Sequence, residues 1–122
     1  MGTFFVEAGL PQNITVKALV DTGATFSKIP SDVLKKLHVK AEFETTIELG
    51  DGRRIKRKVG YVKITLNGKS APVPVVFGKK NERALIGATT LEILGLIPDP
   101  QKKILHEGIH LEVLVTIVQD RV

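Results

Sequence analysis

The most regular feature of the chain is the alternation of apolar and polar residues in short runs. Alternation with a period of two places every second side chain on one face, which is typical of a strand with one buried face. The pattern is clearest in four runs: 14–20, 62–66, 73–77 and 109–117. Because such runs recur along the 122-residue chain with turn residues between them, they predict an all-β protein.

Turn signals between these runs predict hairpins. Strands over Thr3–Val6 and Ile14–Val20 would form one hairpin, and Asn67-Gly68 is a strong signal for another, between the runs 62–66 and 73–77. Pro72 and Pro74 lack the N–H that a ladder needs, so the return strand should lie at an edge or carry a bulge.

A third hairpin is predicted between Thr45–Leu49 and Arg54–Val59, which flank Gly50-Asp51-Gly52-Arg53. Glycine adopts positive φ values readily and aspartate favours tight turns, so these four residues suit an exposed tip. Such a hairpin has the form of a lid over a site, although a surface hairpin without that role has the same sequence.

Two short segments carry helical signals. Pro30–Leu37 predicts a short helix with Ser31 as its N-cap and Asp32 near the positive end of the helix dipole. Thr89–Leu94 predicts one or two helical turns that end at Gly95. Helix is therefore the minor component of a chain whose length suits a single domain, residues 1–122.

Composition restricts the chemistry and the expected location. The chain has no cysteine, which excludes disulfides, thiol catalysis and Cys-rich zinc sites and fits a reducing compartment, so we expect a cytoplasmic protein. The first residues lack the basic and apolar regions of a secretory signal, and no apolar run approaches the length of a membrane span. We expect no membrane partner.

Part of the net charge of +5 is concentrated in one run, which holds Arg53, Arg54, Lys56, Arg57 and Lys58. A basic run of this kind can attract nucleic acid, but Tyr61 is the one aromatic residue near it that could stack on a base. Charges on an exposed edge also prevent unwanted strand pairing, so we interpret the run as a solvated hairpin arm and expect no nucleic-acid partner. Steeply salt-dependent binding of DNA or RNA would support the opposite interpretation.

The strongest candidate for chemistry is Asp21-Thr22-Gly23, which directly follows the apolar run 14–20. Burial and a nearby like charge shift the pKa of carboxyl groups, and the end of a buried strand offers the first of these conditions. Gly23 would let neighbouring backbone approach closely. The same triplet is also ordinary turn chemistry. The strand before it and a second apolar stretch downstream, Leu85-Ile86-Gly87, distinguish it here.

These features together resemble the retropepsin-type aspartic proteases, that is, the retroviral proteases and their single-domain cellular and prokaryotic relatives. Asp21-Thr22-Gly23-Ala24 is similar to the catalytic motif, and residues 45–59 are similar to the flap hairpin. Ala84-Leu85-Ile86-Gly87 and Thr89–Gly95 are similar to the downstream glycine and the short helix after it. The resemblance implies an all-β, closed-barrel-like fold and an aspartic endopeptidase that needs no cofactor and no metal.

The resemblance also implies a homodimer. Peptide hydrolysis by this class needs two carboxyl groups that share one proton, and the chain has one Asp-Thr-Gly. Asp21 of each chain would act as general base or general acid, Thr22 would hydrogen-bond across the two-fold axis, and Gly23 would donate its N–H to the carboxylates. The residues expected to border an extended polypeptide substrate are Ala24, Thr25, Gly50, Asp51, Gly52, Ile86 and Gly87. Pockets lined by Ala24, Ile47, Val75 and Ile86 would favour apolar substrate side chains.

Two positions depart from the retroviral pattern. Retroviral enzymes usually follow the motif with an acidic residue and the downstream glycine with arginine, whereas this chain has Thr25 and Ala88. In the retroviral enzymes these two residues form an ion pair, and this chain lacks both of its partners. The dimer contact and part of the substrate anchoring should therefore differ from those of the retroviral enzymes.

A second protease signature, His-Glu-x-x-His, is matched by residues 106–110 and suggests a zinc site. That signature needs a helix, which Gly108 weakens, and the residues that follow alternate as a strand, about 109–118. In a strand, positions four apart lie roughly 13 Å from each other, too far to share a zinc ion. We therefore expect no metal site.

A further alternative is a protease-like dimerisation or peptide-binding module that kept the fold and lost turnover. A binding module has no evident need for a pair of buried carboxyl groups. The intact Asp21-Thr22-Gly23 therefore favours the enzyme.

Overall fold

The computed structural model describes residues 3–108 of the chain, and strands dominate that range. The strands are β1 (Phe4–Gly9), β2 (Thr15–Val20), β3 (Ser27–Pro30), β4 (Ala41–Glu48), β5 (Arg54–Leu66), β6 (Lys69–Gly78), β7 (Ala84–Ile86), β8 (Leu96–Asp99) and β9 (Ile104–Glu107). Between them lie a 3₁₀ turn, η1 (Pro11–Asn13), and two short helices, α1 (Ser31–Lys36) and α2 (Ala88–Leu94). The all-β prediction is confirmed.

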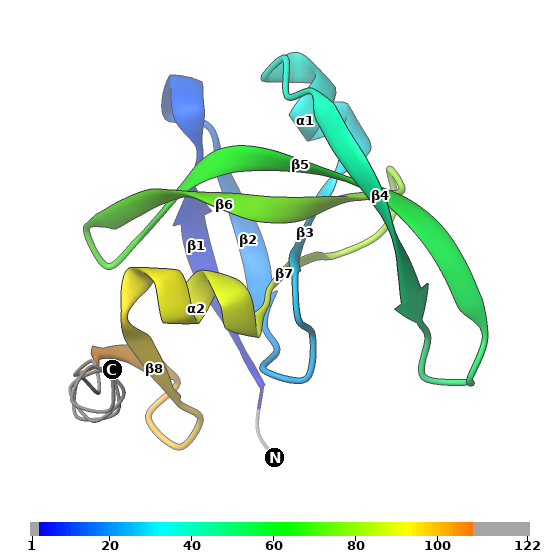
Figure 1. The fold of residues 1–122 in the computed structure, drawn as a ribbon. Coiled ribbons are helices and arrows are strands. Elements are labelled where there is room, and N and C mark those ends of the chain that lie inside the picture. The colour runs from blue at the N-terminus through cyan, green and yellow to red at the C-terminus, as the bar shows by residue number, and fades with distance from the viewer. Residues whose placement is uncertain (1–2, 109–122) are drawn as a thin grey trace, which may run out of the picture.

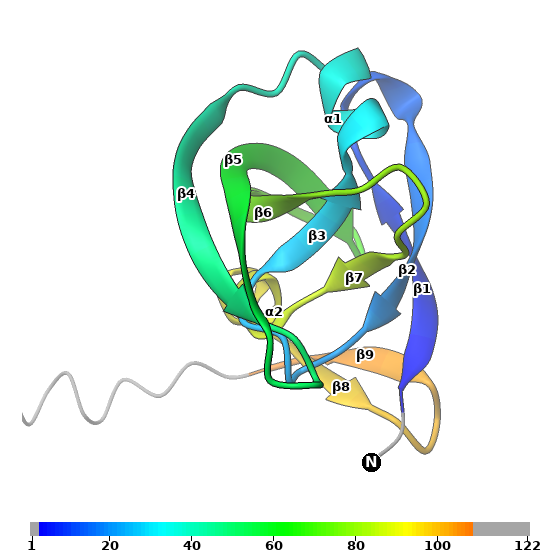
Figure 2. The same cartoon turned by 90° about the vertical axis from the view of Figure 1, so that its right-hand side faces the viewer.

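Seven of these strands form one curved sheet in the order β1-β2-β7-β3-β6-β5-β4 (Figure 1). β1 also pairs with β5, through Gly9 and Thr65, so the sheet curls into a ring (Figure 2). β8 and β9 form a separate two-stranded sheet. This arrangement agrees with the closed-barrel-like fold that the resemblance implies.

The core lies on the inner face of the ring, where alternate residues of the strands point. On β5, for example, Val62, Ile64 and Leu66 are at most 5% exposed, while Lys63 between them is exposed. Burial of such side chains is the main favourable term in folding. The alternation that predicts the strands therefore also predicts which side chains form the core.

Two parallel pairings bring distant segments together. β2 pairs with β7, with Ala18 opposite Ala84 and Val20 opposite Ile86, and β3 pairs with β6. β7 also meets β3, where Lys28 lies opposite Leu85. The end of β2 and the end of β7 thus lie side by side, more than 60 residues apart in sequence.

Several local predictions are confirmed or corrected. Ser31 is not the N-cap: β3 runs directly into α1, Pro30 takes the cap position and no side chain caps the helix. The first strand is longer than predicted and ends at Gly9. Pro72 and Pro74 lie in a section of β6 that pairs with β5 alone among the described strands, because its pairing with β3 begins at Val75. They therefore do lie at an edge.

The strand predicted at about 109–118 lies outside the described residues. Within residues 3–108, neither α1 nor α2 is long and apolar enough to cross a membrane.

Candidate active site

Asp21 directly follows β2, and backbone groups hold it in place. Its N–H donates to the carbonyl oxygen of Ile86 at 2.9 Å, which continues the pairing of β2 with β7. The Gly23 N–H donates to Asp21 Oδ1 at 3.0 Å, and the Ala24 N–H donates to the Asp21 carbonyl oxygen at 3.1 Å. The partly exposed carboxyl group is therefore oriented by its own loop at the end of a paired strand.

The start of α2 fixes the loop that follows Asp21. The Ala88 N–H donates to the carbonyl oxygen of Ala24 at 2.8 Å, and the Thr89 N–H donates to that of Thr25 at 3.0 Å. Gly87 lies so close to the loop that a Cβ there would come within 2.6 Å of the Phe26 backbone. A side chain does not fit at this position, which gives a physical reason for the glycine after Leu85-Ile86.

Two buried hydroxyl groups tie the same segments together. Ser27 Oγ and Thr90 Oγ1 lie 2.6 Å apart and both residues are fully buried, while the Gly87 N–H donates to Ser27 Oγ at 3.0 Å. Sequence reasoning missed this pair because its members are 63 positions apart and neither hydroxyl signals its partner. The pair therefore holds α2 against the end of the loop that follows Asp21.

The predicted residues of the motif lie together on this loop. Thr22, Gly23 and Thr25 are exposed, and Ala24 is partly buried. Within the described part of this chain no backbone closely approaches Gly23, because the one atom within 4 Å of a Cβ built there is Asp21 Oδ1, at 3.2 Å. The contribution of Gly23 is the N–H that it donates to the carboxylate, as the resemblance implies.

A small hollow of about 60 Å³ lies beside the motif. Its walls are Thr3, Phe4, Val20, Asp21, Thr22, Pro98 and Pro100. β8 therefore reaches the edge of the candidate site, which the sequence did not indicate.

The structure places two residues expected to line substrate pockets in the core instead. Ile86 and Val75 are fully buried, so their side chains do not reach the surface in this structure. Ile86 contributes its carbonyl oxygen, which accepts the Asp21 N–H. The partly exposed neighbours of Val20 and Ile86 are Leu19 and Leu85, which lie opposite each other across β2 and β7.

The β4–β5 hairpin ends in the exposed tip predicted from the sequence. The Leu49 N–H donates to the Arg53 carbonyl oxygen at 2.8 Å, and the Asp51 carboxylate accepts the Arg53 N–H at 3.0 Å. Gly52 has a φ of +87°, which favours glycine. Both views show this tip at the same end of the molecule as the loop after β2 (Figures 1 and 2). Gly50, Asp51 and Gly52 are exposed there.

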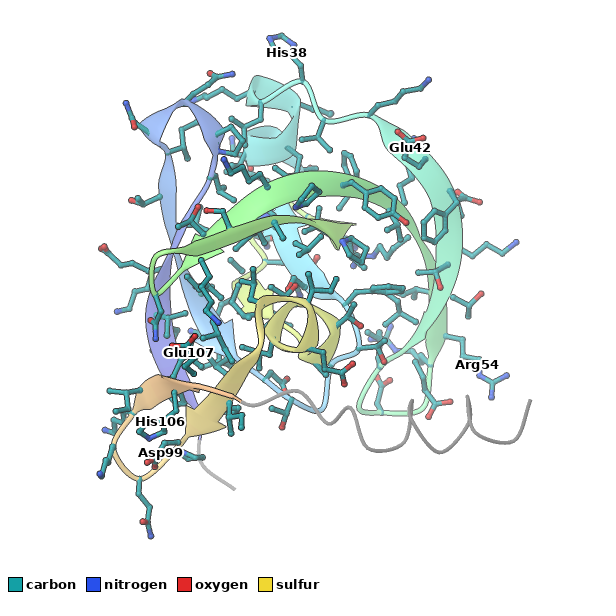
Figure 3. The ribbon with its side chains drawn as sticks, turned by 60° about the vertical axis from the view of Figure 1, so that its left-hand side comes forward. His38, Glu42, Arg54, Asp99, His106 and Glu107 are labelled. Atoms are coloured by element: carbon teal, nitrogen blue, oxygen red, sulfur yellow. The ribbon has the colours of Figure 1, made fainter. Side chains whose placement is uncertain are left out.

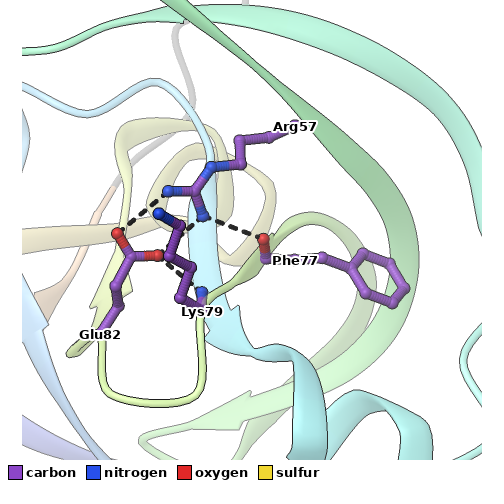
Figure 4. A network of polar contacts seen from close by, with 4 residues as sticks. All are labelled: Arg57, Phe77, Lys79 and Glu82. Atoms are coloured by element: carbon purple, nitrogen blue, oxygen red, sulfur yellow. Dashed lines mark hydrogen bonds and ion pairs between the residues drawn. The ribbon is translucent and has the colours of Figure 1, made fainter.

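The basic arm of this hairpin is solvated except at Arg57. Arg57 Nη1 and Nη2 donate to Glu82 Oε1 and Oε2 at 2.7 and 3.1 Å, and Nη1 lies 3.3 Å from the Phe77 carbonyl oxygen (Figure 4). The hydrogen bonds from Arg57 are the main cause that lowers the pKa of Glu82 from 4.5 to about 2. The interpretation of the run as a solvated arm is therefore wrong for this residue, whose side chain is 13% exposed.

The zinc-protease signature does not begin in a helix. His106 and Glu107 belong to strand β9, and His106 Nε2 lies 2.9 Å from Asp99 Oδ2 (Figure 3). That hydrogen bond is the largest cause of the lowered pKa of Asp99. His110 lies outside the described residues, within which no group of three potential metal ligands occurs.

Comparisons with known proteins agree with this geometry. The family model for aspartyl proteases matches residues 6–96. Among solved structures, a retropepsin-like aspartic protease from Rickettsia conorii is similar, with 24% identity and a TM-score of 0.62, over 85% of this chain and 80% of that chain. A search of the curated proteins gave no match.

Two viral proteases are also similar in structure. The protease of simian foamy virus (mac) has 20% identity and a TM-score of 0.57, over 74% of this chain and 93% of that chain. EIAV protease, in complex with the inhibitor HBY-793, has 18% identity and a TM-score of 0.59, over 75% of this chain and 86% of that chain. Since the family model spans most of the chain, and the fold is that of the retropepsin-like enzymes, the chain belongs to the aspartyl protease family.

Proposed function

We propose that the protein is an aspartic endopeptidase that works as a homodimer, with Asp21 of two chains as its catalytic pair. The observation that carries the proposal is the position of Asp21 at the end of β2, where its carboxyl group accepts the Gly23 N–H and its backbone bonds to Ile86 and Ala24. Its loop is fixed by the close approach of Gly87 and by the Ser27–Thr90 pair. Catalytic groups need a rigid setting of this kind, because small displacements cost large factors in rate.

Two such carboxyl groups are sufficient for the chemistry. One Asp21 is ionised and accepts a proton from water as the water oxygen attacks the scissile carbonyl carbon, while the other donates its proton to the carbonyl oxygen. The C–N bond then breaks as a proton passes to the leaving nitrogen. Two neighbouring carboxyl groups retain one proton because ionising both would place like charges together. The Gly23 N–H orients the carboxyl group to which it donates.

The substrate would be an extended polypeptide between the motif loop and the β4–β5 hairpin. Gly50, Asp51 and Gly52 at the hairpin tip would act as a flap that closes over it, while Thr22 to Thr25 would lie below it. Strand edges offer backbone hydrogen bonds to such a ligand. The cytoplasmic location expected from the sequence stays a prediction, which cell fractionation checks.

The first test is digestion of a mixed peptide library, followed by mass spectrometry from acid to neutral pH. Wild type should cleave peptides with and without a chelator, and Asp21→Ala and the isosteric Asp21→Asn should not. A folded dimer that cleaves nothing would favour the binding module, and cleavage by both variants would show that Asp21 is not the catalyst.

The shared pair has its own test, in which wild type and Asp21→Asn are mixed, unfolded and refolded together. If each site needs Asp21 from two chains, about one quarter of the dimers in an equal mixture are fully wild-type. The mixture then retains about one quarter of the activity of the same total amount of wild type. Activity of about one half would mean that each chain acts alone. Sedimentation of the mixture must show the same fraction of dimer as wild type.

A further inference from the structure

A row of four side chains crosses four neighbouring strands close to Asp21. Phe5 of β1 lies opposite Leu19 of β2, Leu19 lies opposite Leu85 of β7, and Leu85 lies opposite Lys28 of β3. Residues opposite each other in a sheet share a face, so the four lie side by side. The row is two residues, roughly 7 Å, before Asp21 along β2.

This row lies on the face away from the core. The next residues along the same strands, Phe4, Val20, Ile86 and Ile29, are at most 4% exposed and belong to the core. Phe5, by contrast, is 42% exposed, and Leu19, Leu85 and Lys28 are partly exposed. The row is therefore an apolar strip at the surface with a cation at one end.

The other end of the row is also basic. Lys17 Nζ lies 4.7 Å from the centroid of the Phe5 ring, and Arg83 Cζ lies 5.1 Å from it. Contacts of this type attract a cation to the ring face, and they hold both side chains near the row. Within residues 3–108, neither cation forms an ion pair. Glu7 is the acidic residue opposite Lys17.

The surface beside this basic end is concave. A shallow hollow of about 510 Å³ opens there, and its walls include Lys17, Lys80 and Arg83 together with Glu82. The Glu82 carboxylate is already occupied by Arg57. The hollow therefore presents more free positive than negative charge to a ligand.

From this placement, and resting on the proposed function, we propose that the Phe5–Leu19–Leu85–Lys28 row belongs to the substrate surface and selects polypeptides with an acidic side chain near the scissile bond. Leu19 and Leu85 would contact an aliphatic side chain, and Lys17, Arg83 or Lys28 would bind a carboxylate. An extended chain rises about 3.3 Å per residue, so these cations correspond to positions within about four residues of the cut. Carboxylates form strong, geometrically specific hydrogen bonds with arginine.

Peptide binding tests this selection without turnover. The probes are fluorescein-labelled twelve-residue peptides with a central Leu-Leu and one Glu at any of four positions on either side, each paired with its Gln counterpart. Fluorescence anisotropy with Asp21→Asn protein should show about fivefold tighter binding of the best Glu peptide than of its Gln counterpart. The preference should fall below about twofold when Arg83→Gln and Lys28→Gln are added, and also in about 0.5 M salt.

Lys36→Gln is the matched control variant. It removes one exposed cation from α1, which lies at the opposite end of the molecule from the motif loop (Figure 1), and it should leave the fivefold preference unchanged. Far-UV circular dichroism of all variants must match wild type.

The same peptides separate this inference from the proposed function. If wild type cleaves none of them but Asp21→Asn prefers Glu peptides through Arg83 and Lys28, acid selection stands and the endopeptidase proposal fails. If wild type cleaves them with no enrichment of Asp or Glu near the cut, and the Glu and Gln peptides bind equally, acid selection is overturned and the endopeptidase remains. Failure of both peptide sets to bind at about 1 mM also overturns the selection.

Discussion

The ion pair between Arg57 and Glu82 should stabilise the fold in a pH-dependent way. It joins β5, the strand that forms one arm of the hairpin, to the turn between β6 and β7 (Figure 4). The Lys79 N–H also donates to Glu82 Oε1, at 2.6 Å. Arg57 and Glu82 are 13% and 28% exposed, so the pair is more protected from water than the exposed pair Arg54–Glu48.

The magnitude follows from the pKa of Glu82. A decrease from 4.5 to about 2 corresponds to about 3 kcal/mol of preference for the ionised carboxylate in the folded state. Because Glu82 is partly exposed, water screens the interaction, and we expect the pair to contribute about 1–2 kcal/mol. Glu82→Gln keeps the shape of the side chain and removes the charge. It should lower the free energy of unfolding by that amount at pH 6 and lower Tm by roughly 5 °C.

The sign of the pH dependence follows from the direction of the pKa change. A lowered pKa in the folded state means that the stabilisation is complete above 4.5 and is lost as the pH falls towards 2. Wild type and Glu82→Gln should therefore differ at pH 6 and approach each other near pH 2.5. The assay is urea unfolding at fixed protein concentration, followed by far-UV circular dichroism because the chain has no tryptophan.

Glu48→Gln is the matched control for this prediction. Glu48 pairs with Arg54 at 3.4 Å, but the two side chains are 63% and 73% exposed, so its loss should change stability by less than about 0.5 kcal/mol. The reasoning is refuted if Glu82→Gln is as stable as wild type at pH 6. It is also refuted if the difference between them is as large at pH 2.5 as at pH 6.

Three further substitutions test the supports of the candidate site. Gly87→Ala would place a Cβ within 2.6 Å of backbone atoms, so we expect a loss of at least about 2 kcal/mol in urea unfolding and loss of peptide cleavage; wild-type stability would contradict the close approach. Thr90→Val removes the Thr90 hydroxyl and leaves the buried Ser27 hydroxyl with the Gly87 N–H alone; it should cost about 1–3 kcal/mol by the same assay, whereas a neutral effect would contradict the bond. Gly52→Ala forces an L residue to a φ of +87°, at a cost of about 1–2 kcal/mol, and should lower both kcat/KM severalfold and Tm by roughly 5 °C. Gly50→Ala, where a Cβ meets no atom within 4 Å, should leave both unchanged, and equal effects of the two would refute the strain argument.

The features that sequence alone predicted are those determined by neighbouring residues. Asn67 and Gly68 adopt φ values of 51° and 75°, as a tight hairpin turn between two alternating runs requires. Gly95 ends α2 at a φ of 66°. The strand that Asp21 directly follows, β2, is likewise predicted by its own alternation, although its pairing with β7 is not. Local pattern thus predicted the type and approximate extent of most elements.

The supports of the site were not predictable, because they join residues far apart in the chain. Ser27 bonds with Thr90, and Arg57 bonds with Glu82, across 63 and 25 positions. A serine, threonine or arginine carries no signal of which distant residue it will meet. These contacts depend on the parallel pairings of β2 with β7 and of β3 with β6, which set the register between distant segments.

The sequence pattern also could not decide which residues near Asp21 face the substrate. Residues 18–20 and 84–86 are apolar on both faces, so alternation cannot distinguish inward Val20 and Ile86 from outward Leu19 and Leu85. The expectation that Ile86 borders the substrate chose the inward side, and burial in the structure reverses that choice. A shift of one position moves a side chain to the other face. The same shift replaces purely apolar pockets by a leucine strip with basic ends. The proposed substrate therefore keeps an aliphatic side chain near the scissile bond and gains an acidic one.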